Sequence, residues 1–163
     1  MQPGQILVAD HEGVYVIKLV GDVRLTLCIS FDQFIDAMFS SDKFCSILFD
    51  LTDAEAIDST TLGLMAKISI LGRERKNIVP VVVSTNPSIN RLLESMGFDD
   101  IFEIIHHVDQ PALAEPVNTR LPATEVSERE ARDRVLEAHR ILMGLNDNNR
   151  EIFQDLVQTL ENS

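Results

Sequence analysis

Apolar and polar residues fall into blocks along the first part of the chain, and the blocks differ in period. Two apolar-rich segments, Ile6–Ala9 and Val14–Val20, are separated by a short turn that contains Gly13, and this spacing predicts an antiparallel hairpin. Apolar residues then recur at helical spacing over Phe31–Phe39, with Ser30 as the expected N-cap of a helix. The chain is therefore expected to begin with two strands and a helix.

Strands and helices alternate through the middle of the chain. The apolar run Ser46–Leu51 predicts a buried strand that ends in an acidic loop, and Ser59–Lys76 predicts a long helix with cations in its last turn. Val79–Val83 has the composition of a parallel central strand. A helix from Asn86 to Met96 and a strand at Ile101–Ile105 are expected to follow. This order predicts an α/β fold with a mixed β-sheet and helices mainly on one side of it.

The character of the sequence changes after residue 108. Three of the chain's six prolines fall between residues 109 and 125, which is typical of a linker. Ser127-Glu-Arg-Glu130 is a capping box that opens a helix to about Leu145, and a second apolar stripe marks another helix after it. We expect a helical hairpin, for which homodimerisation, partner docking and packing within the chain all remain open. The expected units are a domain at residues 1–108, a linker at residues 109–125 and a helical hairpin extension at residues 126–163.

Composition restricts the class of protein. Apolar residues make up 45% and charged residues 25% of the 163 residues, as in ordinary folded domains. The sequence has no run of about 18 apolar residues and no basic N-terminal block before an apolar one, so we expect neither a membrane span nor a signal peptide. The net charge of −12 disfavours binding to nucleic acid, and it suits either simple solubility or a positively charged protein partner. Cys28 and Cys45 lie in apolar surroundings, which indicates reduced core thiols in a cytoplasmic protein.

The segment from Asp58 to Leu64 carries the most informative pattern. It reads Asp-Ser-Thr-Thr-Leu-Gly-Leu and places Ser59 at a helix N-terminus beside a carboxylate. The positive end of the helix dipole tolerates an anion there, including a phosphate on the protein itself. The segment resembles the signature of the STAS family, the bacterial anti-anti-sigma factors, whose loop reads Asp-Ser-Ser/Thr-Gly-Leu-Gly. Thr61 stands where that family usually has glycine.

The resemblance covers about residues 5–108, because residues 90–104 also resemble the family's late helix, glycine and final strand. It implies a STAS-like fold and a regulator that is switched by phosphorylation of Ser59. The unmodified form would bind an anti-sigma factor, or a serine kinase of the anti-sigma type, and so free a sigma factor. The phosphorylated form would release that partner, and a serine phosphatase would restore the unmodified form. Thr60 and Thr61 are alternative acceptors, and plain N-capping is the alternative role of all three hydroxyls.

The predicted helix Ser59–Lys76 has two apolar faces when its residues are projected at about 100° each. One face holds large residues and is expected to be buried. The other is small and apolar, which suits close docking of another protein, unless the C-terminal hairpin covers it. A phosphate on Ser59 adds roughly −1.5 to −2 charges at the rim of this face and should prevent docking without unfolding the domain. The expected partner-binding residues are Asp58, Ser59, Leu62, Gly63, Ala66 and Ile70.

An enzyme is the less favoured alternative. Asp50, Asp53 and Asp58 follow a central strand, where α/β enzymes often place catalytic groups. The sequence has no Walker-type loop and no nucleophile elbow, and the adjacent His106 and His107 would point to opposite faces of a strand. We therefore expect no catalytic activity, no metal site and no cofactor. A STAS-like scaffold or small-ligand sensor without a phospho-switch is the alternative function.

Overall fold

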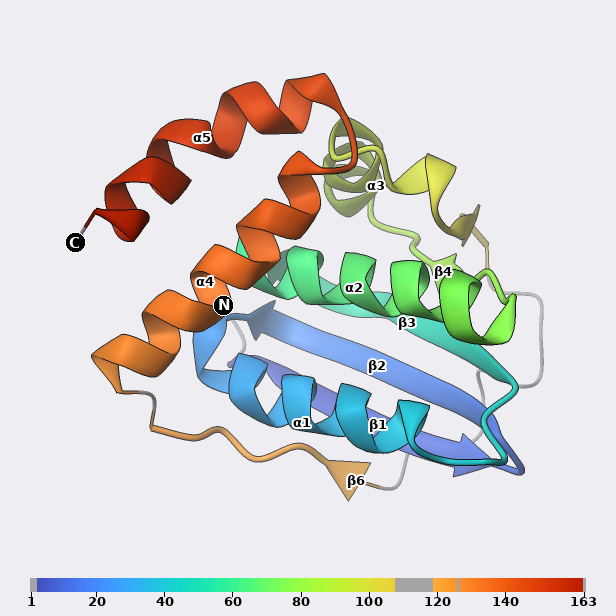
Figure 1. Ribbon diagram of the computed structural model, residues 1–163. Coiled ribbons are helices and arrows are strands. Elements are labelled where there is room, and N and C mark those ends of the chain that lie inside the picture. Colours follow the sequence, from blue (N-terminus) through green and yellow to red (C-terminus); the bar gives the residue numbers. More distant parts are fainter. Residues whose placement is uncertain (1–2, 108–118, 126, 163) are drawn as a thin grey trace.

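The computed structural model describes residues 3–107, 119–125 and 127–162, which form a mixed six-stranded sheet with helices packed over it (Figure 1). The strand order is β5-β4-β3-β2-β1-β6. The strands are β1 (Gln5–His11), β2 (Val14–Val23), β3 (Ser46–Ile57), β4 (Val81–Val83), β5 (Glu103–Ile105) and β6 (Thr119–Arg120). The helices are α1 (Cys28–Phe39), α2 (Ser59–Lys76), α3 (Pro87–Ser95), α4 (Glu128–Met143) and α5 (Asp147–Glu161), with 3-10 turns η1 (Leu25–Leu27) and η2 (Phe98–Asp100). The predicted α/β fold with a C-terminal helical hairpin is confirmed.

The predicted hairpin is formed by β1 and β2, which pair antiparallel. Its turn uses positive φ angles at Glu12 (54°) and Gly13 (92°), and the Gly13 N–H donates to the Asp10 carboxylate at 2.9 Å. A Cβ on Gly13 would overlap the carbonyl oxygen of Lys43, so glycine is required there both by dihedral angle and by space. The remaining central pairs, β2–β3, β3–β4 and β4–β5, are parallel, and β6 pairs antiparallel with β1.

Strand β3 is longer than the sequence pattern predicts. We expected the strand to end at Leu51 in an acidic loop, but it continues to Ile57 because its second half pairs with β2 after two register shifts. Side chains alternate along this half, with Asp53 and Glu55 exposed and Ala54 buried. Asp53 and Glu55 therefore occupy outward-facing positions of a strand. Side chains of a strand alternate between its two faces, and a search for continuous apolar residues alone misses this alternation.

Helix α1 also begins earlier than predicted. The 3-10 turn η1 leads directly into Cys28, so Ser30 lies inside the helix and is not its N-cap. The Ser30 hydroxyl instead donates to the carbonyl oxygen of Pro122 at 2.6 Å. This serine therefore fastens a segment from much later in the chain onto α1.

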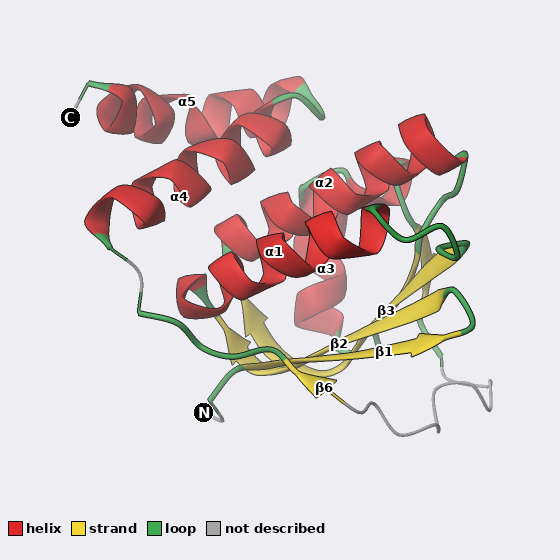
Figure 2. Cartoon of the chain, turned by 60° about the horizontal axis from the view of Figure 1, so that its bottom comes forward, coloured by secondary structure: helices red, strands yellow, loops and turns green. Residues whose placement is uncertain are grey.

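The helices form two layers on one side of the sheet (Figure 2). Helices α1, α2 and α3 lie next to the sheet, and α4 and α5 lie farther out. The main core lies between sheet and inner helices, and its largest fully buried side chains include Phe31, Phe49 and Phe98. Among the described residues, no helix combines the length and the apolarity that a membrane span requires.

The C-terminal part returns to the domain before the helical hairpin begins. Of the segment expected to be a linker, residues 109–118 lie outside the described residues. After them, the Leu121 N–H donates to the carbonyl oxygen of Ile6 at 2.8 Å, beside β6. The predicted cap of α4 is present, because Ser127 accepts from the Glu130 N–H at 3.1 Å. The hairpin is thus held to the sheet edge by the residues that precede it, and its dimerisation stays a prediction.

Candidate functional site

The start of α2 is built around the side chain of Asp58. This residue has an extended backbone, and its carboxylate accepts the Thr61 N–H at 2.8 Å, so it is the N-cap of the helix. Ser59 is the first helical residue and is partly exposed, whereas Thr60 (5%) and Thr61 (0%) are buried. Thr61 has no positive φ, which agrees with the regular start that a β-branched residue demands. Of the three candidate hydroxyls, Ser59 is therefore the most accessible.

Thr61 is directed inward, where its hydroxyl lies 3.5 Å from the Cys28 sulfur. Burial raises the pKa of the Cys28 thiol to about 12, against the opposing effect of the hydrogen bond with Thr61. Cys28 is thus a neutral core residue, as its apolar surroundings in the sequence predict. Cys45 differs, because it is exposed, so the expectation of two core thiols is wrong for Cys45.

The Ser59 hydroxyl makes a hydrogen bond that the sequence did not suggest. Its oxygen lies 2.6 Å from Nε2 of His139, in the middle of α4. Nδ1 of the same ring lies 2.6 Å from the Val135 carbonyl oxygen, which only accepts, so Nδ1 carries the proton. In a neutral ring Nε2 is then the acceptor, and Ser59 donates to it. His139 is 2% exposed, and its ring meets that of Phe153 edge-on at 4.8 Å between centroids.

We call Ser59, Gly63, Ala66 and Ile70 the Ser59 face of α2. Helix α4 lies against it, and the views in Figures 1 and 2 agree on this. Gly63 allows the close approach, because a Cβ there would come within 2.5 Å of the Ala138 Cβ. Ala66 is fully buried, Leu62 is 1% exposed within the core, and Ile70 is half-buried. The Ser59 face is therefore not an exposed docking surface. The C-terminal hairpin covers it, which is the alternative that the sequence left open.

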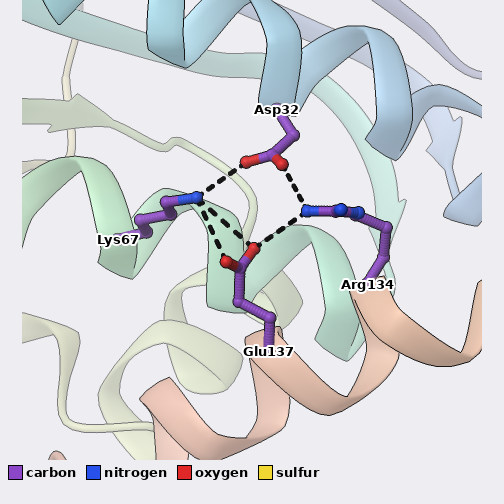
Figure 3. Close-up of polar contacts among 4 residues, drawn as sticks. All are labelled: Asp32, Lys67, Arg134 and Glu137. Carbon is purple, nitrogen blue, oxygen red and sulfur yellow. Dashed lines mark hydrogen bonds and ion pairs between the residues drawn. The ribbon is translucent and has the colours of Figure 1, made fainter. Parts of the chain in front are cut away.

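A group of four charged residues joins α1, α2 and α4 beside the Ser59 face (Figure 3). We call Asp32, Lys67, Arg134 and Glu137 the charge cluster. Lys67 lies 2.9 Å from Asp32 and 3.3 Å from Glu137. Arg134 pairs with Asp32 and lies 3.3 Å from Glu137. Two cations and two anions therefore alternate around a closed ring that ties α4 to the inner helix layer.

The charge cluster changes the titration of its lysine. Burial by itself lowers the pKa of Lys67, but the hydrogen bond from Lys67 to Asp32 and the charges of Asp32 and Glu137 outweigh this effect. The pKa of Lys67 consequently lies above its ordinary value of 10.5. The sequence pattern missed this cluster, since its bonded members are up to 102 positions apart.

The corner between α4 and α5 makes a separate contact with the domain. Asn146 caps α5 by accepting the Asn149 N–H at 2.8 Å. The fully buried Asn149 side chain donates to the carbonyl oxygens of Met96 at 2.8 Å and of Leu142 at 2.9 Å. The hairpin is thus held at its corner by an amide and along α4 by Ser59, Gly63 and the charge cluster.

Two of the carboxylates considered for an enzyme, Asp50 and Asp53, lie in β3 and have partners within the sheet. Lys18 of β2 lies 2.8 Å from Asp53 and 3.9 Å from Asp50. Asp50 also accepts from the Thr52 hydroxyl at 2.6 Å. The hydrogen bond with Asp53 raises the pKa of Lys18 against the effect of burial. In the described ranges, no three His, Cys, Asp or Glu residues are grouped so that they could hold a metal ion.

Comparisons with known proteins match the sheet-and-helix part of the chain. The family model of the STAS domain matches residues 5–110. An anti-sigma factor antagonist from Mycobacterium paratuberculosis has a similar structure, with a TM-score of 0.54, 25% identity and coverage of 69% of this chain and 93% of that one. SpoIIAA, an anti-sigma factor antagonist in its unphosphorylated form, gives a TM-score of 0.50 at 16% identity, covering 66% of this chain and 92% of its own. The comparison with curated proteins found no match. Helices α4 and α5 lie beyond the residues that the family model matches.

Proposed function

Because the chain belongs to the STAS domain family, we propose that it is a protein-binding regulator of the anti-anti-sigma type, switched at Ser59. In this proposal the unmodified form binds an anti-sigma factor or a related serine kinase in the cytoplasm. Phosphorylation of Ser59 releases that partner, and a serine phosphatase reverses the modification. The chain acts as a binder and a substrate, with no catalytic residue, metal or cofactor of its own.

The observation that carries this proposal is the position of Ser59. It is the first residue of α2, next to the N-cap Asp58, and it is partly exposed while the two neighbouring threonines are buried. A helix N-terminus stabilises an added negative charge by roughly 0.3–1 kcal/mol at an exposed site. Phosphorylation there is consequently compatible with the fold of the domain. The description of the mycobacterial structure as an anti-sigma factor antagonist supports the class of partner.

A phosphate on Ser59 opposes partner binding for an electrostatic reason. It adds roughly −1.5 to −2 charges at neutral pH, and Asp58 already carries a negative charge beside it. A partner that covers this group must remove it from water, which costs several kcal/mol unless a new cation pairs with it. Allosteric couplings are typically about 1–3 kcal/mol, so this penalty is large enough to switch binding.

The test is capture of partners by full-length protein carrying phosphoserine at position 59 and by unmodified protein, followed by mass spectrometry. Phosphoserine at position 88 is the matched control, because Ser88 lies in the first turn of α3 and is exposed. We expect an anti-sigma factor or serine kinase with the unmodified and Ser88-modified proteins, and at least about tenfold less with the Ser59-modified protein. Equal recovery from all three would contradict the switch and favour a scaffold or ligand sensor.

A further inference from the structure

Helix α4 lies on the surface that the proposed partner needs. Its residues meet α2 at three successive points, with His139 at Ser59, Ala138 at Gly63 and Glu137 at Lys67. As the residue number rises along α2, the residue number of the contacting position falls along α4, so the two helices run in opposite directions at these contacts. A rigid partner cannot reach the Ser59 hydroxyl or Gly63 while these contacts are made, because each contact is at hydrogen-bond or van der Waals distance.

We propose that α4 is a built-in competitor for the Ser59 face: it opens to admit the partner or the kinase, and it closes again only while Ser59 is unmodified. This inference rests on the proposed function, and it adds a regulatory element that lies outside the residues matched by the family model. The STAS domain and α4 then behave as a two-state pair. In the closed state His139 accepts from Ser59, and in the open state that hydroxyl is free.

The contacts made by α4 indicate what a competing partner segment must present. Asp32 and Lys67 pair with each other, but a cation beside Asp32 and an anion beside Lys67 add favourable contacts, and Gly63 leaves room only for a small side chain against it. Helix α4 supplies these as Arg134, Glu137 and Ala138 within a little more than one helical turn. A partner helix with an Arg or Lys, an acidic residue three positions later and a small residue next to that acid fits the same surface.

Phosphorylation of Ser59 cannot leave the closed state intact. A phosphoserine has no hydroxyl hydrogen on Oγ to donate to Nε2 of His139. Its phosphorus atom is covalently bonded to Oγ, so it lies closer to Oγ than Nε2 does in the closed state. The space beside Oγ is taken by the ring, at 2.6 Å, and the ring is buried against Phe153. The phosphate consequently displaces His139 and, with it, the middle of α4.

The closed state also reduces the apparent affinity of any ligand of the Ser59 face. When only a fraction f of molecules is open, the apparent dissociation constant equals the intrinsic constant divided by f. A variant that loosens α4 raises f. It should therefore increase partner affinity and the rate of phosphorylation of Ser59 by the same factor, up to the point at which the open state predominates.

Hydrogen exchange of the full-length chain tests the inference without any partner. We compare unmodified protein with protein carrying phosphoserine at position 59, and use phosphoserine at position 88 as the matched control. Exchange over residues 134–140 should accelerate at least about tenfold in the Ser59-modified protein, and less at the corner held by Asn149. Strand β3 should keep its protection in all three proteins. Unchanged protection of α4 in the Ser59-modified protein would overturn the inference. This includes the case in which the phosphate forms an ion pair with a protonated His139 ring and so keeps α4 in place.

A charge reversal on α4 provides a second test. Arg134→Glu places an anion opposite Asp32 and beside Glu137 and should accelerate exchange of α4 about tenfold. A quadruple variant that reverses every charge of the cluster (Asp32→Lys, Lys67→Glu, Arg134→Glu and Glu137→Arg) keeps cations and anions alternating and should restore most of the protection. Arg129→Glu is the control, because it makes the same charge change at an exposed position on α4. Equal effects of Arg134→Glu and Arg129→Glu, or no rescue by the folded quadruple variant, would also overturn the inference.

The two proposals fail in different ways. If α4 opens on phosphorylation but no anti-sigma factor or serine kinase is captured by the unmodified protein, the proposed function is wrong, whereas the opening of α4 by a phosphate on Ser59 stands. If such a partner is captured and lost on phosphorylation while α4 keeps its protection, the proposed function stands and the competitor role is wrong.

Discussion

Two helices of this molecule begin in nearly the same way and lie in different surroundings. Asp58 caps α2 and Asn86 caps α3, and each side chain accepts a backbone N–H of the first turn, at 2.8 and 2.9 Å respectively. Each first turn carries a serine. Ser59 donates to His139 of α4, whereas Ser88 is exposed.

The difference between the two starts shows that a helix N-terminus alone does not define a switch. Both termini offer free N–H groups and a positive dipole end to an anion. The Ser59 hydroxyl is bonded to a side chain of another helix, whereas Ser88 is exposed and accepts from Arg91 of its own helix at 3.4 Å. An added phosphate therefore displaces a packed helix at Ser59 and not at Ser88. A modification at Ser88 should change the local charge and leave the packing of the molecule as it is.

The largest expected effect concerns the core beneath the Ser59 face. Leu62 is 1% exposed, so Leu62→Ala should lower the free energy of unfolding by about 3 kcal/mol. Leu92→Ala on α3 is the comparison. Leu92 is only half-buried, so this substitution should lower the free energy of unfolding by about 1 kcal/mol. Urea denaturation measures both values. A smaller loss for Leu62 than for Leu92 would contradict the placement of Leu62 in the core.

The contact of α4 with α2 is tested by two glycines of one helix. Gly63→Ala should lower the free energy of unfolding by about 2 kcal/mol, because its Cβ would overlap Ala138. Gly72→Ala should change it by less than about 1 kcal/mol, since its Cβ meets Cγ1 of Ile78 at 3.1 Å, which a small shift of that side chain relieves, and alanine favours the helix. Equal losses in urea denaturation would show that α4 does not lie on Gly63.

The two caps should be equivalent for stability, although their surroundings differ. Asp58→Ala and Asn86→Ala each remove one bond to a backbone N–H and should each lower the free energy of unfolding by about 1 kcal/mol. The conservative variants Asp58→Asn and Asn86→Asp keep an oxygen that accepts this bond, so they should retain most of the wild-type stability. Thermal and urea unfolding of the four variants check this, and a neutral Asp58→Ala would remove Asp58 from the role of N-cap.

The smallest expected effect is a pH dependence of the charge cluster. The pKa of Lys67 is raised above 10.5 in the folded protein, so the stability linked to this shift is fully present below about pH 10.5. It is lost as the pH rises through the higher folded-state pKa. Wild type and Lys67→Met should differ in free energy of unfolding by under about 1 kcal/mol below pH 10.5. This difference should therefore shrink above that pH. The exposed Lys76→Met is the control, and a difference that grew with pH would contradict the sign of the shift.

The sequence predicted the elements that depend on local pattern. The hairpin with Gly13 in its turn, the long helix that begins at Ser59 and the cap at Ser127 all follow from spacing and turn chemistry within a few residues. The family resemblance, based on residues 58–64 and 90–104, is confirmed by the match of the STAS family model to residues 5–110. The length of β3 was missed because its outward positions are acidic and were interpreted as a loop.

The surroundings of Ser59 could not be predicted in the same way. The small residues Gly63 and Ala66 correctly indicated a face for close packing, but a sequence pattern does not say which element packs there. His139 carried one usable signal, since it lies on the apolar side of its helix between Ala138 and Leu142. A polar residue in such a position must find a partner when buried. That partner is 80 positions away, and only the tertiary structure identifies it.

The imidazole ring of His139 reports the central contact most directly, through the nitrogen-15 NMR spectrum of the full-length protein at about pH 8, where a free imidazole is neutral. For unmodified protein, we expect a single tautomer with the proton on Nδ1, which lies against the Val135 carbonyl oxygen, and an unprotonated Nε2. Phosphoserine at position 59 should abolish this state, whereas phosphoserine at position 88 should preserve it. A ring protonated on Nε2 in the unmodified protein, or one unchanged by phosphoserine at position 59, would contradict the coupling of Ser59 to α4.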